Sequence, residues 1–314
     1  MAAPPVCAGC GTALPRAAIV CPRCGRPVYQ LAGRRARRRR NASVVGLAGS
    51  LMMAAQSACM LVGGSIALVA LSAAASGELD RGRSIAGTAA ILVGFALLFD
   101  LVGVAFLIGA FHAYSRASGV PLGTRDPERR SFLFHGFLAT IFLLLWLLVT
   151  LAWRGALAAI VTFYPTPFGG GIGPVATADV QRAASIMLGL WVTAAFLLFL
   201  GAVYGTRFLA RARGMPITFP RLLWPFETFV HVCAAVAILI VAPGLLANLR
   251  LEMSTLSLIE TLGAVELIVV PVLGLLAYTF LFRDFVHLYR ASIGPIVARP
   301  PPEPVPAEPP AGGT

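Results

Sequence analysis

Apolar residues occur along the chain in long runs that are separated by short polar segments. The runs cover residues 43–75, 85–114, 132–153, 183–209, 226–249 and 256–282. Each run is long enough to cross the roughly 30 Å hydrocarbon core of a bilayer as a helix, because an α-helix rises about 1.5 Å per residue. The pattern therefore predicts an all-α membrane protein with six transmembrane helices.

The overall composition excludes an ordinary soluble domain. Hydrophobic residues make up 58% of the chain and charged residues 12%, whereas soluble domains are roughly 45–50% apolar and about 25% charged. A soluble protein would have to bury all of these runs in one core.

The distribution of arginine predicts how the helices are oriented. Arginines concentrate at 34–40, 116–130, 211–221 and 290–299, whereas the opposite connections hold only Arg81, Arg83, Arg154, Arg182 and Arg250. Positive loops stay in the cytoplasm, and the first thirty residues contain no apolar segment of signal-peptide type. We therefore expect both termini in the cytoplasm.

The composition also indicates the source of the protein. A chain rich in alanine and glycine that uses arginine as its basic residue indicates a bacterial source. The expected location is therefore the bacterial inner membrane, with multiple passes.

A short pattern recurs at the cytoplasmic ends of the second, fourth and sixth runs. Residues 114–121, 209–216 and 288–295 each place an Arg-Ala pair shortly before a glycine and a proline. Arginine favours the negative end of a helix, and glycine and proline end it. The pattern is explained either by three repeated helical hairpins or by the fact that any helix ending on the cytoplasmic side favours arginine, glycine and proline.

Four cysteines stand before the first apolar run in a CxxCG motif and a CPxCG motif. Cys7, Cys10, Cys21 and Cys24 can supply four thiolates to one tetrahedral metal ion, and a reducing cytosol favours metal over disulfides. A segment this short has little core, so metal binding would supply most of its folding free energy. Cys59 and Cys233 lie inside apolar runs and are expected to be small packing residues.

Residues 7–28, which contain these motifs, resemble the short zinc ribbon found at the N-termini of many bacterial membrane and regulatory proteins. The resemblance implies a structural zinc ion on the four cysteines, although iron can use the same ligands. Ribbons of this kind serve as docking or nucleic-acid-binding modules, so a cytosolic protein partner is expected through this segment.

The domain organisation follows from these features. We expect a zinc ribbon at 1–29, a polybasic juxtamembrane linker at 30–42, a six-helix domain at 43–290 and a disordered Pro-rich tail at 291–314. The uncharged connection at 155–181 is either a re-entrant segment or a flexible outer loop.

Basic residues near the cytoplasmic ends of the runs indicate contact with lipids or anions. Arginines beside a membrane attract anionic headgroups, and the absence of interleaved aromatic residues disfavours nucleic acid. Histidines at the run ends predict a lipid or anion site together with arginines of the fourth run, or, in pairs, haem ligation. The residues concerned are Arg37, Arg38, Arg39, Arg40, His112, His135, Arg207, Arg211, His231 and His287.

Two acidic residues fall inside apolar runs, where a carboxylate is costly unless it faces the bundle interior. They are Asp100 and Glu266. With no arginine expected at the depth of Asp100, its carboxyl group is predicted to be protonated or hydrogen-bonded to a hydroxyl group. Together these residues mark either a structural hydrogen bond between helices, which is favoured, or a proton or substrate path.

Common catalytic motifs such as HExxH, the Walker loop and GxGxxG are absent, which disfavours an enzyme. The favoured interpretation is a membrane scaffold or docking protein with a structural zinc ribbon. One alternative is a small transporter or channel that uses Asp100 and Glu266, and another is a haem or redox membrane protein that uses the histidines.

Overall fold

Long helices form nearly all of the structure, which is a computed structural model. It describes residues 7, 10–13, 21, 23–24, 33–75, 78–118, 127–163, 177–214, 216–247 and 262–293, and contains no β-strand within them. The elements are α1 (Gly33–Ala75), α2 (Leu79–Ala117), α3 (Pro127–Phe163), α4 (Thr177–Arg213), α5 (Phe219–Ala247), the π-helix η1 (Val265–Val269) and α7 (Val270–Ile293). The expected all-α class is confirmed.

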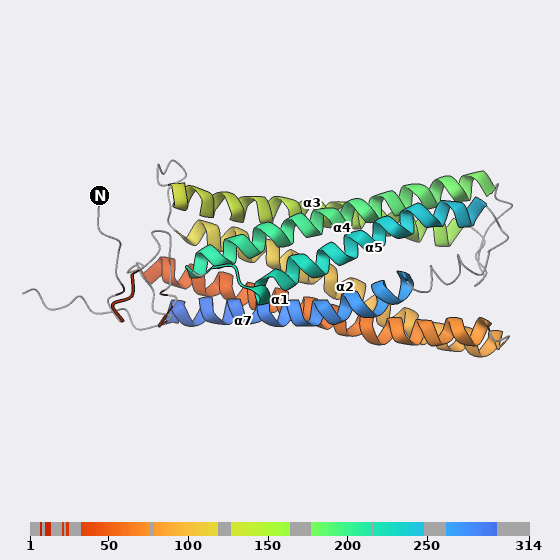
Figure 1. The fold of residues 1–314 in the computed structure, drawn as a ribbon, viewed down its shortest axis with the longest axis horizontal. Helices are drawn as coiled ribbons and strands as arrows, with labels where there is room; N and C mark the ends of the chain where they lie inside the picture. Colours follow the sequence, from red (N-terminus) through yellow and green to blue (C-terminus); the bar gives the residue numbers. More distant parts are fainter. Residues whose placement is uncertain are drawn as a thin grey trace, which may run out of the picture.

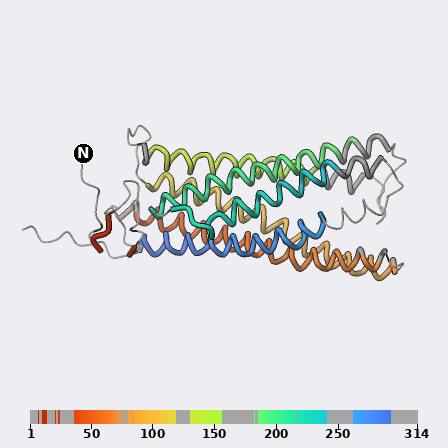
Figure 2. The backbone as a smooth tube through the Cα atoms, viewed as in Figure 1, coloured from red at the N-terminus to blue at the C-terminus, as the bar shows by residue number. Residues whose placement is uncertain are grey.

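The helices are arranged as a ring in chain order (Figures 1 and 2). Each helix packs against the next one along the chain, and α7 closes the ring by packing against α1. Six of the described helices are long and apolar enough to cross a membrane. The chain is therefore a multi-pass membrane protein, as its apolar pattern predicted.

Several helices begin or end well beyond the apolar runs, because the runs mark only the lipid-facing part. Helix α1 begins at Gly33, so the polybasic stretch forms its first turns. Helix α5 begins at Phe219, ahead of the apolar run at 226–249, with Pro220 in its first turn, where a missing N–H costs nothing. Because of this early start, residue 226 lies seven residues inside α5, whereas the apolar run alone placed it at the helix start.

The recurring Arg-Ala pattern lies where helices end. Helix α2 ends at Ala117, α4 at Arg213 and α7 at Ile293, each inside one of the three patterned segments. Gly214, directly after α4, has a φ of +63°, a conformation that glycine adopts without strain. The predicted helix stops are confirmed, whereas hairpin repetition stays a prediction.

Two predicted segments lie largely outside the described residues. At 155–181, α3 continues through Phe163 and α4 starts at Thr177, and the residues between them are not described. The tail after Ile293 is likewise outside the described part.

The buried core lies mainly in the half of the ring next to the cysteines. Phe111 is at its centre, with ring centroids 5.6 Å from Phe208, 6.3 Å from Trp224 and 6.1 Å from Phe285. These aromatic rings come from four different helices. Their packing closes the bundle axis at this end.

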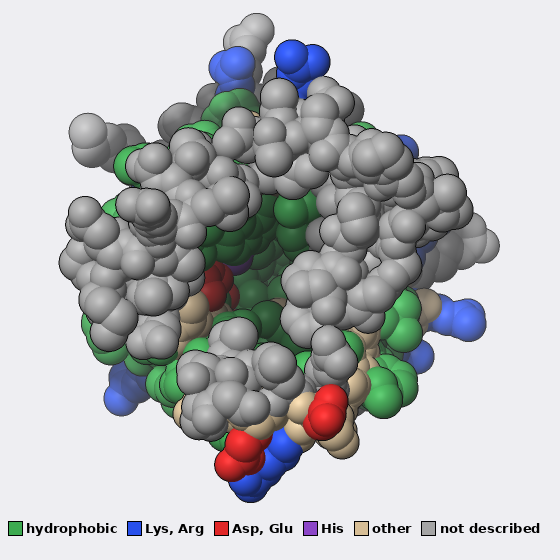
Figure 3. All heavy atoms as spheres, turned by 90° about the vertical axis from the view of Figure 1, so that its right-hand side faces the viewer, with side chains coloured by type: hydrophobic (Ala, Val, Ile, Leu, Met, Phe, Trp, Pro, Cys, Tyr) green, Lys and Arg blue, Asp and Glu red, His purple; other side chains and the backbone are tan. Residues whose placement is uncertain are grey.

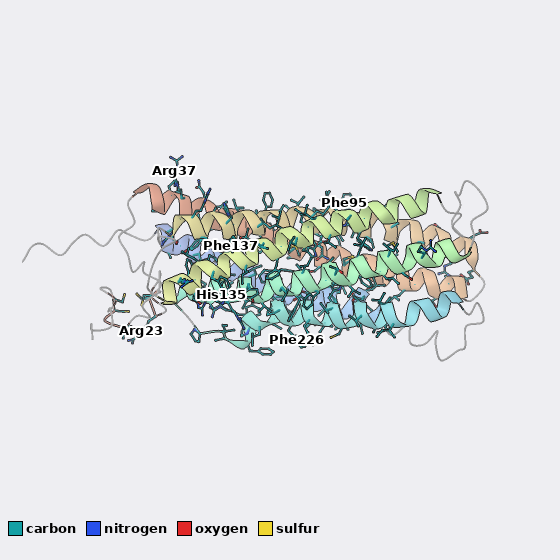
Figure 4. All side chains as sticks on the ribbon, turned by 90° about the horizontal axis from the view of Figure 1, so that it is seen from above. Arg23, Arg37, Phe95, His135, Phe137 and Phe226 are labelled. Carbon is teal, nitrogen blue, oxygen red and sulfur yellow. The ribbon has the colours of Figure 1, made fainter. Side chains whose placement is uncertain are left out.

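The outer surface of the ring is apolar. Phe95, Phe137 and Phe226, labelled in Figure 4, are 51%, 60% and 51% exposed. Exposed aromatic residues on this scale are normal for a helix that faces lipid rather than water.

Ionic contacts hold the helix ends together at the cysteine-bearing end. Buried Asp284 of α7 accepts hydrogen bonds from Arg213 and from Arg221, the latter at 3.1 Å. Buried Arg39 of α1 donates to the carbonyl oxygens of Ala117 and Ser118, at 3.1 and 2.8 Å. It thereby satisfies carbonyl groups that the end of α2 leaves without a helical partner.

The closest approach between α1 and η1 generates a prediction about stability. A Cβ atom on Gly64 would lie 2.8 Å from Leu267 Cβ and 2.9 Å from the Leu267 carbonyl oxygen. Gly64→Ala should therefore lower the free energy of unfolding by about 1–3 kcal/mol, measured by thermal unfolding in detergent. Gly94→Ala is the control, because nothing lies within 4 Å of the added Cβ, and it should stabilise by roughly 0.5–1 kcal/mol. Equal effects of the two substitutions would contradict the prediction.

Candidate functional site

The four N-terminal cysteines form a compact group beside the end of the bundle (Figure 1). Their sulfur atoms all lie within 4.8 Å of one another. Cys7 Sγ is 3.6 Å from Cys24 Sγ, and Cys10 Sγ is 3.4 Å from Cys21 Sγ. Zn–S bonds of about 2.3 Å in a tetrahedron give sulfur separations of about 3.8 Å, so the donor set fits a metal ion of this size. The predicted clustering of the four thiols is confirmed.

A tight turn positions the first two of these sulfur atoms. The Gly11 N–H donates to the Cys7 carbonyl oxygen at 2.9 Å, and Gly11 has a φ of +68°, which explains the glycine of the CxxCG motif. Hydrogen bonding from Thr12 lowers the pKa of the Cys10 thiol to about 6. The thiolate, which is the form that binds metal, is thus favoured at neutral pH.

A second group of reactive residues lies in the interior of the membrane-spanning ring. It consists of Asp100 of α2, Arg154 of α3, Glu227 and His231 of α5, and Glu266 of η1. We call these residues the polar cluster.

Asp100 is paired with an arginine. Arg154 Nη2 donates to Asp100 Oδ2 at 2.9 Å, and its Nη1 donates to the Leu97 carbonyl oxygen at 2.6 Å. The two side chains are only 15% and 16% exposed. The expectation that no arginine lies at this depth is therefore wrong. The apolar run ends at residue 153, but α3 continues to Phe163, so Arg154 is inside a helix and its long side chain reaches Asp100.

Glu266 is paired with a histidine. His231 Nδ1 lies 2.8 Å from Glu266 Oε2, and these side chains are 21% and 12% exposed. Glu227 is one turn before His231 on α5, hence on the same helix face, and is only 6% exposed. The charges of Asp100, His231 and Glu266 all act on the Glu227 carboxyl group.

The polar cluster contains hydrogen-bonding atoms that the described residues leave unpaired. They are Arg154 Nε, Glu227 Oε2 and Glu266 Oε1. Such atoms are costly in an apolar interior. Three of them in one group indicate a place built to receive a polar or charged species.

Glu266 stands in an irregular helical turn. The π-helix η1 precedes Pro271, which has no N–H to offer to the carbonyl group four residues earlier. Turns of this kind are rare in proteins overall. Those that occur are often found at functional sites. Gly64 of α1 allows the close contact with this turn.

A hollow lies at the end of the ring opposite the cysteines. Figure 3 looks into this end, and shows hydrophobic side chains on the described walls with acidic and histidine side chains further in.

The four histidines do not share one depth, contrary to the expectation. His231 contacts Glu266, whereas His287 lies on the same continuous helical run as Glu266 but 21 residues later, which is roughly 30 Å. His112 is exposed on α2, and His135 is buried on α3 near the cysteine-bearing end (Figure 4). Among the described residues, the cysteines form the one group of three or more potential metal ligands. Haem ligation by a pair of histidines stays a prediction.

The structure brings together only some of the residues predicted to contact lipids or anions. His135, Arg207 and Arg211 line one pocket. Arg37, which points away from the bundle in Figure 4, is exposed, as are Arg38 and Arg40, whereas Arg39 is buried against the end of α2. A lipid role for the three exposed arginines stays a prediction.

Two members of the polar cluster were missed by sequence analysis. Arg154 lies in a connection that was predicted to be outside the membrane, and the sequence pattern did not single out Glu227. The usable signal for Glu227 was its spacing of four from His231, which puts two ionisable groups on one face of a helix.

Comparisons with protein-family models, curated proteins and solved structures found no match to this chain.

The cysteine geometry predicts how the metal content depends on single residues. Purified full-length protein should contain about one equivalent of zinc per chain, and Cys21→Ser should lose most of it, because a closed structural site requires all four ligands. The measurement is elemental analysis after gel filtration in detergent. Cys59→Ser and Cys233→Ser are the controls and should keep the metal. Unchanged metal content in Cys21→Ser would contradict the assignment.

Proposed function

We propose that this protein is a cation transporter of the bacterial inner membrane, in which the polar cluster binds the transported or coupling ion. The proton is the simplest such cation. Both termini face the cytoplasm, as the arginine distribution favours, and the N-terminal ribbon holds a structural zinc ion.

The charge balance of the polar cluster supports a cation. Three carboxyl groups face one guanidinium group and one imidazole group. Even with His231 protonated, the cluster carries one negative charge more than its own cations neutralise. Net charge in a membrane interior is expensive, so binding of a proton or another cation lowers the free energy of this arrangement.

The observation that carries the proposal is the position of the Glu227 carboxyl group. Its Oε2 atom is buried and has no hydrogen-bond partner among the described residues, although the charges of His231 and Glu266 are close enough to act on the carboxyl group. A carboxyl group in this setting can accept a proton or coordinate a cation. Ionisable residues inside membrane domains commonly mark ion pathways.

The two ends of the ring differ in a way that suits one-sided access. At the end opposite the cysteines, a hollow exposes acidic and histidine side chains (Figure 3). At the cysteine-bearing end, the rings around Phe111 fill the axis, and Asp284 ties α7 to Arg213 and Arg221. This difference between the described parts of the two ends supports access from one side. Transport requires a rearrangement of this aromatic packing, as alternating access demands.

Ion flux in reconstituted vesicles tests the proposal. With a pH-sensitive dye inside the vesicles and an imposed membrane potential, wild-type protein should raise proton entry above that of protein-free vesicles. Glu227→Gln keeps the size of the side chain but removes its charge, and should lower the rate by at least tenfold. Asp100→Asn should also lower the rate, because it leaves Arg154 without its charged partner.

The matched control is Glu78→Gln, which removes a carboxylate from an exposed pair with Arg81 at the edge of the ring. Its flux should equal that of wild type. If wild-type vesicles are no more permeable to protons, sodium or potassium than empty vesicles, or if Glu227→Gln transports normally, the proposal is wrong.

A second function, docking of a cytosolic protein, is favoured by the position of the metal centre. The cysteine group lies beside the end of the ring, beyond the start of α1 (Figure 1), and Cys24 is exposed. Affinity capture with the full-length protein should recover a defined partner with wild type and lose it with the double variant Cys21→Ser/Cys24→Ser. A set of captured proteins that is identical for Cys59→Ser, wild type and the double variant would exclude the ribbon as the docking element.

A further inference from the structure

A pocket lies between α3, α4 and the segment that leads to α5, at the cysteine-bearing end. Its volume is about 280 Å³. It is lined by His135, Arg207, Ala210, Arg211, Pro216 and Ile217. The polar cluster contributes none of these residues, so the pocket is a separate site.

The polar groups of the pocket are all basic. Arg207 and Arg211 are four residues apart on α4, and like charges at this spacing on one helix face repel each other. His135 reaches the same place from α3, with its Nδ1 atom 2.6 Å from Arg211 Nη1. None of the residues that line the pocket is acidic. This concentration of positive charge favours an anion.

The neighbouring arginines at this end serve a different purpose. Arg213 and Arg221 converge on Asp284, and Arg39 holds the end of α2. Arg207 instead keeps an exposed guanidinium group, which lies over the Tyr204 ring at 5.9 Å from the ring centre. The aromatic ring stabilises the guanidinium group of a residue that lines the pocket.

The surroundings of the pocket show which anion it suits. Exposed apolar side chains adjoin it on the segment leading to α5, at the start of α5 and on α3, with Ile217 44%, Phe219 75% and Phe134 54% exposed. A basic pocket bordered by apolar surface, at the end of a membrane-spanning bundle, fits a charged headgroup with its acyl chains alongside.

We propose that the pocket formed by His135, Arg207 and Arg211 binds a phosphate group, either that of an anionic phospholipid or free phosphate. Two guanidinium groups match the oxygen atoms of a phosphate with paired, charge-assisted hydrogen bonds. The apolar border favours the lipid.

Binding to full-length protein in a neutral detergent tests this assignment. The probes are phosphatidylglycerol, diacylglycerol with the same acyl chains, and inorganic phosphate at constant ionic strength. The readouts are the shift in unfolding temperature and the Kd from its concentration dependence. Phosphatidylglycerol should stabilise the wild type and diacylglycerol should not. Arg207→Gln should bind about tenfold more weakly, as expected for one lost charge-assisted contact.

Two further variants separate specific recognition from general attraction. Arg207→Lys keeps the charge but loses the planar fork, and should fall between wild type and Arg207→Gln. Arg116→Gln removes an exposed arginine of α2 that does not line the pocket, and should bind like wild type. A response to inorganic phosphate alone would identify free phosphate as a ligand, whereas a response only to phosphatidylglycerol would identify the lipid.

The assignment is overturned if no phosphate-bearing probe stabilises the wild type. It is also overturned if Arg207→Gln binds as tightly as wild type, or if Arg116→Gln loses as much affinity as Arg207→Gln. Because Arg207 is exposed, its replacement should leave the unfolding temperature without added ligand close to that of wild type.

Discussion

The cost of placing a charge in hydrocarbon governs the arrangement of this protein. The lipid-facing surface can remain apolar only if the ionisable groups within the spans point inward and find partners there. Asp100 meets Arg154, and His231 meets Glu266. Each pair joins two different helices, so the requirement that isolates these groups from lipid also ties helices α2 to α3 and α5 to η1.

The ring of helices divides into two unlike halves. In the half next to the cysteines, aromatic side chains from several helices fill the axis, and small residues such as Gly136 and Gly201 allow close packing against Phe208 and Leu143. In the other half, a hollow exposes acidic and histidine side chains (Figure 3). The proposed cation transport role rests on this difference between a packed half and a hollow half. Glu227 Oε2 and Glu266 Oε1, which have no hydrogen-bond partner among the described residues, support a preference of the polar cluster for cations.

The metal centre and the membrane domain differ in what holds them together. Four sulfur atoms within 4.8 Å of one another would gain their stability from a bound metal ion, which for zinc-finger peptides contributes about 10–16 kcal/mol. The ring depends on apolar packing and on a few buried ion pairs. Loss of metal should therefore disrupt the N-terminal segment and leave the ring intact, which allows the two parts to serve separate purposes.

The sequence by itself determined the class of protein and the metal ligands. The lengths of the apolar runs suffice to recognise six spans, because the thickness of a bilayer sets the length of a membrane-spanning helix. The spacing of the cysteines suffices to recognise Cys7, Cys10, Cys21 and Cys24 as one donor set, because paired CxxC motifs are local in the chain. The stops of α2, α4 and α7 were equally local and equally predictable.

Only the tertiary structure decided which intramembrane groups meet. Asp100 and Arg154 are far apart in the chain, as are His231 and Glu266, and no local pattern determines how two helices are rotated toward each other. Helix α5 begins before its apolar run, which moved Glu227 and His231 from the expected membrane surface into the interior. The predicted anion site combined all four histidines with Arg207 and Arg211, but only His135 lines a pocket with these arginines, because membership depends on α3 and α4 packing side by side. Contacts between helices follow from packing of whole faces, and that information is spread over the entire ring.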